Sequence, residues 1–73
     1  MARVECYAGY QGDERPLRFH IGDRTVAVER ILERWRRPEA NGFRVSTPEG
    51  AYVLEQRVSD GSWTVRRWRA RTS

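Results

Sequence analysis

Polar and apolar residues alternate along much of this chain, and that alternation limits its possible folds more than any other feature. Leu17, Phe19 and Ile21 are separated by Arg18 and His20. A period of two places alternate side chains on opposite faces of a strand, so three apolar side chains would share one face and two basic ones the other. The pattern predicts antiparallel strands with one buried face.

Short turn sequences separate the alternating segments. Gly22-Asp23 predicts a tight hairpin reversal. In Thr47-Pro48-Glu49-Gly50, proline presets one dihedral angle and glycine accepts a positive one, which predicts a second turn. Ser59-Asp60-Gly61-Ser62 predicts a third, and residues 9–14 predict a polar connection. Strands are predicted over residues 4–8, 17–21, 43–46, 51–58 and from Trp63 onward.

The segment over residues 26–36 is ambiguous. Its apolar residues lie at i, i+3, i+4 and i+7, and they are Val28, Ile31, Leu32 and Trp35. This spacing is typical of one face of a helix. A strand also accounts for it if a bulge near Glu29-Arg30 reverses the alternation, so that Ile31 and Trp35 again face inward. Periodicity alone slightly favours the helix.

These patterns predict an all-β domain of five or six antiparallel strands in meander order, curled into a small barrel or a strongly bent sheet. The alternative is an α+β domain with residues 26–36 as a helix across the sheet. A chain of 73 residues forms one domain and buries only about 60% of the surface that its unfolded form exposes. Its core therefore needs its large apolar side chains, and Trp35 and Trp63 are predicted to belong to it.

The positive charge of the chain is concentrated at its C-terminal end. The net charge is +4, and all fourteen basic residues are arginine. The first sixty residues carry ten arginines and ten acidic residues, so the whole excess lies beyond Asp60. We therefore predict a balanced domain over residues 1–68 and a basic tail over residues 69–73.

The sequence gives little support to catalysis. His20 is the only histidine and Cys6 the only cysteine, so there is no Cys/His cluster with zinc spacing. His20 is predicted to stand alone on the polar face of a strand, which does not favour a Ser/His/Asp or Cys/His set. The carboxylates are interleaved with arginines, which favours ion pairing over acid–base catalysis. We expect no enzyme activity, no metal or other cofactor, and no small-molecule substrate. No segment has the length and apolarity of a signal peptide or a membrane span, so we expect a cytoplasmic protein.

Several segments together resemble a family of short bacterial proteins of unknown function. They are VECYAGY (4–10), ERPLRF (14–19), Gly-x-Arg (22–24), VERILERW (28–35), FRV (43–45) and Gly-x-Trp (61–63). A similar domain occurs at the C-terminal end of some proteins related to the Y-family DNA polymerases. The resemblance implies a compact, mostly β domain in which VERILERW forms a long, bent strand. It also hints at DNA transactions, whereas the arginine-rich end, RRWRARTS, departs from the family pattern.

Binding of single-stranded nucleic acid is the function that the residues favour, because sheet aromatics can stack on bases while arginines hold the phosphates. The candidate residues are Arg66, Arg67, Trp68, Arg69, Arg71, Arg18, Arg44, Arg57 and Tyr7. Strict alternation places Trp63 and Trp68 on opposite faces, and a bulge at Arg66-Arg67 would return Trp68 to the core. The alternative function is a protein-interaction or homodimerisation module that acts through a sheet edge.

Overall fold

The computed structural model describes residues 3–8 and 14–69, and these residues form strands and turns without a helix. The described residues form seven strands, rather than the five or six predicted. They are β1 (Arg3–Ala8), β2 (Glu14–Ile21), β3 (Arg24–Ala27), β4 (Arg30–Arg36), β5 (Ala40–Thr47), β6 (Gly50–Arg57) and β7 (Trp63–Arg67). The prediction of an all-β class is confirmed.

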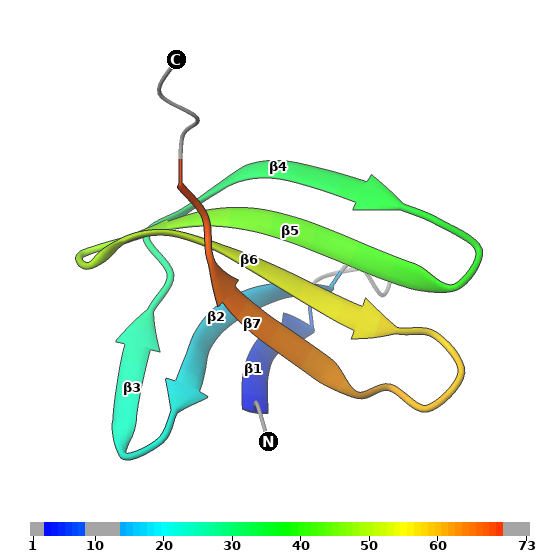
Figure 1. Cartoon of the computed structure of the whole chain (residues 1–73), viewed down its shortest axis with the longest axis horizontal. Coiled ribbons are helices and arrows are strands. Elements are labelled where there is room, and N and C mark those ends of the chain that lie inside the picture. The colour runs from blue at the N-terminus through cyan, green and yellow to red at the C-terminus, as the bar shows by residue number, and fades with distance from the viewer. Residues whose placement is uncertain (1–2, 9–13, 70–73) are drawn as a thin grey trace.

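The strands form two antiparallel sheets in meander order (Figure 1). One sheet has the order β1-β2-β3, and the other has the order β4-β5-β6-β7. Each strand pairs only with its neighbours in the chain, as predicted. The two sheets do not close into a barrel. We expected the strands to form one curled or bent sheet, whereas the chain passes from a first sheet to a second one.

The hydrophobic core lies between the two sheets. Phe19 and Val26 come from the three-stranded sheet, and Val45, Tyr52 and Leu54 come from the four-stranded sheet. The rings of Phe19 and Tyr52 meet edge to face, with centroids 5.0 Å apart. Full burial of one such side chain contributes about 1.5 to 3 kcal/mol. A small set of residues therefore holds the two sheets together.

The chain changes sheets between two consecutive residues. The Val28 N–H donates to the Leu17 carbonyl in β2 at 2.8 Å, whereas the Glu29 N–H donates to the Ser46 carbonyl in β5 at 2.7 Å. The helix alternative for residues 26–36 is therefore wrong, because β3 and β4 occupy this segment. Of the segment VERILERW, for which the resemblance implies one long, bent strand, residues 30–35 do belong to a single strand, β4, whereas Val28 and Glu29 connect it to β3.

Two register irregularities explain the exposed leucines. In β4, Ile31 pairs with Val45 and Glu33 with Arg44, so Leu32 is an extra residue that is 38% exposed. The bulge thus lies at Leu32 and not at Glu29-Arg30. In β2 the register shifts where β1 passes from Glu5 to Cys6, and Leu17, predicted to face inward, is 41% exposed.

The predicted turns at the hairpin ends are confirmed. Gly22 in the β2–β3 turn has φ of 55°, and Gly50 at the β5–β6 turn has φ of 113°. Residues with a Cβ rarely adopt these values, which is why glycine follows Glu49. The Thr47 hydroxyl closes the same turn by donating to the Gly50 carbonyl at 2.7 Å and accepting from the Glu49 N–H at 3.0 Å.

Candidate functional site

The outer face of the four-stranded sheet, which is the face turned away from the core, holds several of the candidate residues. One row across this face consists of Glu33 (β4), Arg44 (β5), Val53 (β6) and Arg66 (β7), which are successive cross-strand partners. Val53 is only 5% exposed although it lies outside the core cluster. Long side chains from the neighbouring strands therefore cover it.

Trp68 belongs to this outer face. The β6–β7 register runs without a break from Gln56 and Trp63 to Tyr52 and Arg67, so no bulge turns Trp68 inward. Its N–H continues the pairing by donating to the Ala51 carbonyl at 3.0 Å. Trp63, on the opposite face, packs against the core, as predicted. Trp68 is 38% exposed, which leaves ring surface in contact with solvent.

Arg44 connects the middle of the sheet to Trp68. Its guanidinium carbon lies 4.6 Å from the centroid of the Trp68 ring, in cation–π geometry. Its Nε donates to the Glu33 carboxylate at 3.3 Å. Among the described residues, the structure gives its two terminal nitrogens no hydrogen-bond or ion-pair partner. Arg44 is thus oriented by Glu33 and Trp68 while retaining donors for a ligand.

A second tryptophan, Trp35, was predicted to belong to the core, but it lies on the same outer face as Trp68. It pairs with Gly42, and its indole lies where a Cβ on Gly42 would be. Its Nε1 is buried and has no hydrogen-bond partner among the described residues. The Leu32 bulge reverses the alternation and so turns Trp35 outward. A glycine inside a strand was the one sequence signal for this close approach.

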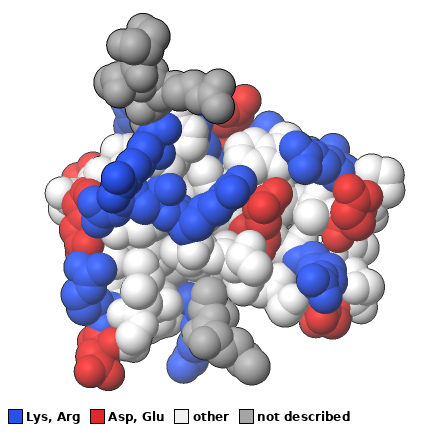
Figure 2. All heavy atoms as spheres, viewed as in Figure 1, with Lys and Arg blue, Asp and Glu red and all other residues white. Residues whose placement is uncertain are grey.

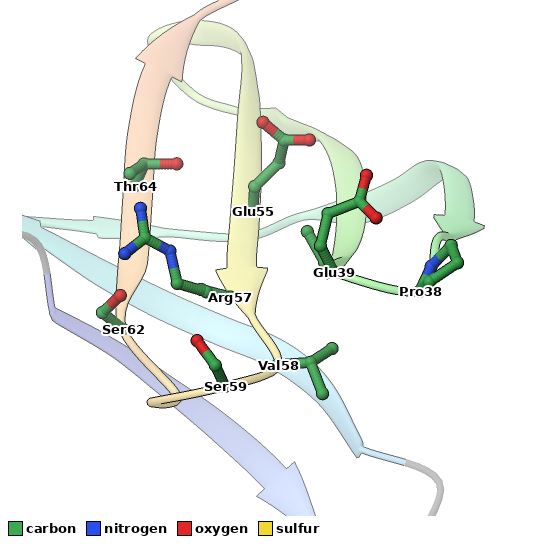
Figure 3. Close-up of a pocket in the computed structure, with 9 residues that line it drawn as sticks. Pro38, Glu39, Glu55, Arg57, Val58, Ser59, Ser62 and Thr64 are labelled. Carbon is green, nitrogen blue, oxygen red and sulfur yellow. The ribbon is translucent and has the colours of Figure 1, made fainter.

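At the end of the sheet away from Trp68, the outer face carries carboxylates. A shallow depression of about 480 Å³ lies where β6 turns into β7 (Figure 3), and its lining includes the carboxylates of Glu39 and Glu55. Arg57, a candidate residue, extends into this region from β6. Its guanidinium lies 3.8 Å from the Asp60 carboxylate. Arg57 is therefore grouped with carboxylates and is separated from the Arg44–Trp68 pair.

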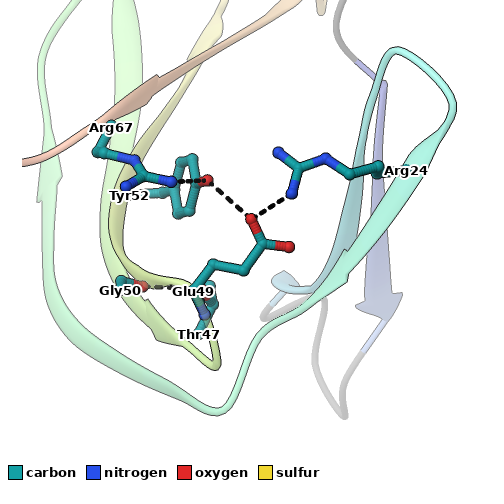
Figure 4. Close-up of polar contacts among 6 residues, drawn as sticks. All are labelled: Arg24, Thr47, Glu49, Gly50, Tyr52 and Arg67. Atoms are coloured by element: carbon teal, nitrogen blue, oxygen red, sulfur yellow. Dashed lines mark hydrogen bonds and ion pairs between the residues drawn. The ribbon is translucent and has the colours of Figure 1, made fainter.

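Arg67 points to the inner face, where it takes part in a link between the sheets (Figure 4). It donates to the Tyr52 hydroxyl at 3.1 Å and lies over that ring, with its guanidinium carbon 5.4 Å from the centroid. The Tyr52 hydroxyl donates to Glu49 at 3.4 Å, and Glu49 also binds Arg24 of β3. This hydrogen bond to Glu49 raises the pKa of Arg24.

Arg18 and Tyr7 lie on the three-stranded sheet. Arg18 is 3.5 Å from Glu5, and His20 Nε2 is 2.6 Å from the same carboxylate. The hydrogen bond with His20, helped by the charge of Arg18, lowers the pKa of Glu5. Tyr7 is 53% exposed on β1. The structure therefore does not bring these two candidates to the face that carries Trp68.

Basic and acidic side chains are interspersed over the side of the molecule shown in Figure 2, and basic ones gather in a band near the C-terminal end of β7. Arg69 is exposed, and Arg71 lies outside the described residues. Within the described residues, no group of three or more His, Cys, Asp or Glu side chains is placed to hold a metal ion. The same residues include no helix able to span a membrane.

Comparison of the chain with protein-family models, with characterised proteins and with solved structures finds no match.

Proposed function

We propose that this protein binds single-stranded nucleic acid weakly, through the outer face of the four-stranded sheet. The observation that carries the proposal is the position of Trp68, which is exposed on that face beside Arg44 and follows Arg66 and Arg67 directly in the chain. A base stacked on such a ring gains about 1 to 3 kcal/mol, whatever its identity. The expected binding is therefore tolerant of sequence.

The arginines on this face supply the phosphate contacts in the proposal. Arg66 is exposed and has no ion pair in the structure of the described residues. Arg44 keeps its terminal nitrogens available, and its pair with Glu33 is a surface ion pair of the kind that contributes only about 0 to 1 kcal/mol. A phosphate can therefore compete for Arg44 at little cost. Arg69 and Arg71 add charge beyond β7.

The charge distribution limits where a strand of nucleic acid would run. Glu39 and Glu55 line the depression at the β6–β7 turn, and their carboxylates would repel phosphate. The proposed contact therefore covers the end of the sheet that carries Arg44, Arg66 and Trp68. It does not include Arg57, which lies among the carboxylates. A site of this size spans few nucleotides, which fits weak binding.

The test measures binding of a fluorescein-labelled oligothymidine by anisotropy at several salt concentrations. Three or four neutralised phosphates give a log–log slope of roughly −2 to −3, at about −0.7 for each phosphate of a single strand. Arg66→Ala should reduce the magnitude of the slope by about 0.7. Trp68→Leu should weaken binding about fivefold or more, as loss of one stacked base predicts, with little change in slope.

Arg18→Ala is the matched control because it removes the same single charge from the other sheet. It should leave the slope nearly unchanged. Equal effects of Arg66→Ala and Arg18→Ala would show that binding responds only to net charge, and the proposed site would then be wrong. No binding by the unaltered protein at low salt would refute the function itself.

A further inference from the structure

The open edge of β7 carries a second inference. Among the described residues β7 is the last strand of its sheet, and only one of its edges is paired. The Trp68 N–H donates to the Ala51 carbonyl, and the Ser62 carbonyl accepts from the Arg57 N–H. The backbone N–H and C=O groups of the even-numbered residues of β7 therefore point to β6. In an antiparallel strand the N–H and C=O of one residue point the same way, and this direction alternates. The backbone groups of Trp63, Val65 and Arg67 therefore point to the open edge.

The two edges of this sheet differ in how they are protected. Natural edge strands avoid pairing with other chains by means of bulges, proline and inward-pointing charges. β4, at the opposite edge, has its register broken between Ile31 and Glu33. β7 has an unbroken register and no proline, and its one inward-pointing charge, Arg67, is held by Tyr52 of the same sheet. Trp63 and Val65 on its inner face are only partly buried. β7 is therefore the edge that can accept another strand.

We propose that β7 pairs antiparallel with β7 of a second copy of this chain, with the two-fold axis at Val65. In this register the two Val65 residues exchange backbone hydrogen bonds, because their N–H and C=O groups both face the open edge. Trp63 lies opposite Arg67 of the second copy, and Thr64 lies opposite Arg66 of the second copy. No arginine faces an arginine, and a cation and an aromatic ring are neighbours.

Other registers of the same strand are poorer. Hydrogen bonding at this edge requires each odd-numbered residue to lie opposite an odd-numbered residue of the second copy. The two-fold axis must therefore pass through a residue of β7 and not between two residues. An axis at Arg66 places two arginines directly opposite each other in the closely spaced type of pair, which is destabilising. An axis at Thr64 leaves Arg67 beyond the end of the opposing strand, since β7 begins at Trp63. The Val65 axis uses the whole strand.

Pairing in this way joins the two four-stranded sheets into one continuous sheet with a single outer face. A two-fold axis perpendicular to that sheet keeps both copies of Trp68 on the same side. The inference rests on the edge of β7 and not on the proposed nucleic-acid contact. A monomer that binds nucleic acid would refute only the dimer. A dimer that binds no nucleic acid would refute only the proposed function.

The first test measures the molecular mass of the unaltered protein by light scattering over a range of protein concentrations. We expect the mass to rise reversibly from that of a monomer to that of a dimer as the concentration increases. Val65→Pro removes the edge N–H but no hydrogen bond to β6. It should weaken dimerisation about tenfold or more, as expected from losing two backbone hydrogen bonds. The proposal would be overturned if the unaltered protein stayed monomeric at all concentrations. It would also be overturned if a folded Val65→Pro variant dimerised as strongly as the unaltered protein.

Crosslinking tests the register even if the proline variant does not fold. In a background with Cys6→Ser, Val65→Cys places two thiols opposite each other at a Cα separation of about 5.5 Å, which a disulfide can span. Thr64→Cys is the matched control because Thr64 faces Arg66 of the second copy. We expect the Val65→Cys protein to form a disulfide dimer much faster under mild oxidation. Equal rates, or faster crosslinking of the Thr64→Cys protein, would refute this register.

Discussion

Replacing Gly42 by alanine tests the packing of Trp35 through the sign of its effect. Glycine inside a strand costs about 0.5 to 1 kcal/mol relative to alanine, so Gly42→Ala should stabilise an ordinary strand. Here the added Cβ would overlap the Trp35 indole. Overpacking of this kind costs about 1 to 3 kcal/mol. We therefore expect a lower free energy of unfolding, because the steric cost exceeds the gain in backbone entropy.

A double-mutant cycle makes this prediction specific. In a Trp35→Ala background the indole is gone, and Gly42→Ala should then stabilise the protein by about 0.5 to 1 kcal/mol. The difference between the two backgrounds is the overpacking cost itself, so the coupling energy should be about 1 to 3 kcal/mol. Urea unfolding followed by circular dichroism measures all four proteins without depending on tryptophan fluorescence. Stabilisation by Gly42→Ala in the unaltered chain, or the same effect in both backgrounds, would refute the described contact.

Two further predictions concern the core and the three-stranded sheet. Leu54 is fully buried between the sheets, so Leu54→Ala should cost about 2 to 5 kcal/mol, and calorimetry should show a melting temperature lower by about 8 °C or more; a loss of only about 2 to 3 °C would contradict the assigned core. Glu5 has a lowered pKa in the folded protein, so its stabilising effect is present above its ordinary value of 4.5 and is lost as the pH falls through the folded pKa. Urea unfolding at about pH 7 and about pH 3 should show a smaller acid destabilisation for Glu5→Gln than for the unaltered chain, and equal losses would count against the His20–Glu5 contact.

The regular strands and their turns could be predicted because each depends on local chemistry. Phe19 lies on the buried face of an alternating segment, and Gly50 has the backbone angle that its turn requires. For Trp68 the sequence left two orientations open, and the structure has the one that strict alternation gives, since β7 contains no irregularity. Where the alternation continued without interruption, the sequence was sufficient to assign the face of a side chain.

The errors arose where one residue interrupted the alternation. The extra residue Leu32 makes residues 28–35 look helical and turns Trp35 to the outer face. Leu17 is exposed through a similar irregularity in β2. A bulge depends on pairing with a partner strand, which periodicity along one strand does not contain. The distribution of the candidate arginines over both sheets could not be foreseen either, because the change of sheets between Val28 and Glu29 also depends on pairing with distant strands.

The change of sheets between Val28 and Glu29 also has a consequence for the speed of folding. Because β1, β2 and β3 pair only with one another, and β4 to β7 do likewise, every strand pairing joins segments that are close in sequence. Little loop-closure entropy is lost before each hairpin forms. Among domains made only of β-strands, this chain should therefore fold quickly, with its two sheets forming separately and the contact of Phe19 with Tyr52 completing the process.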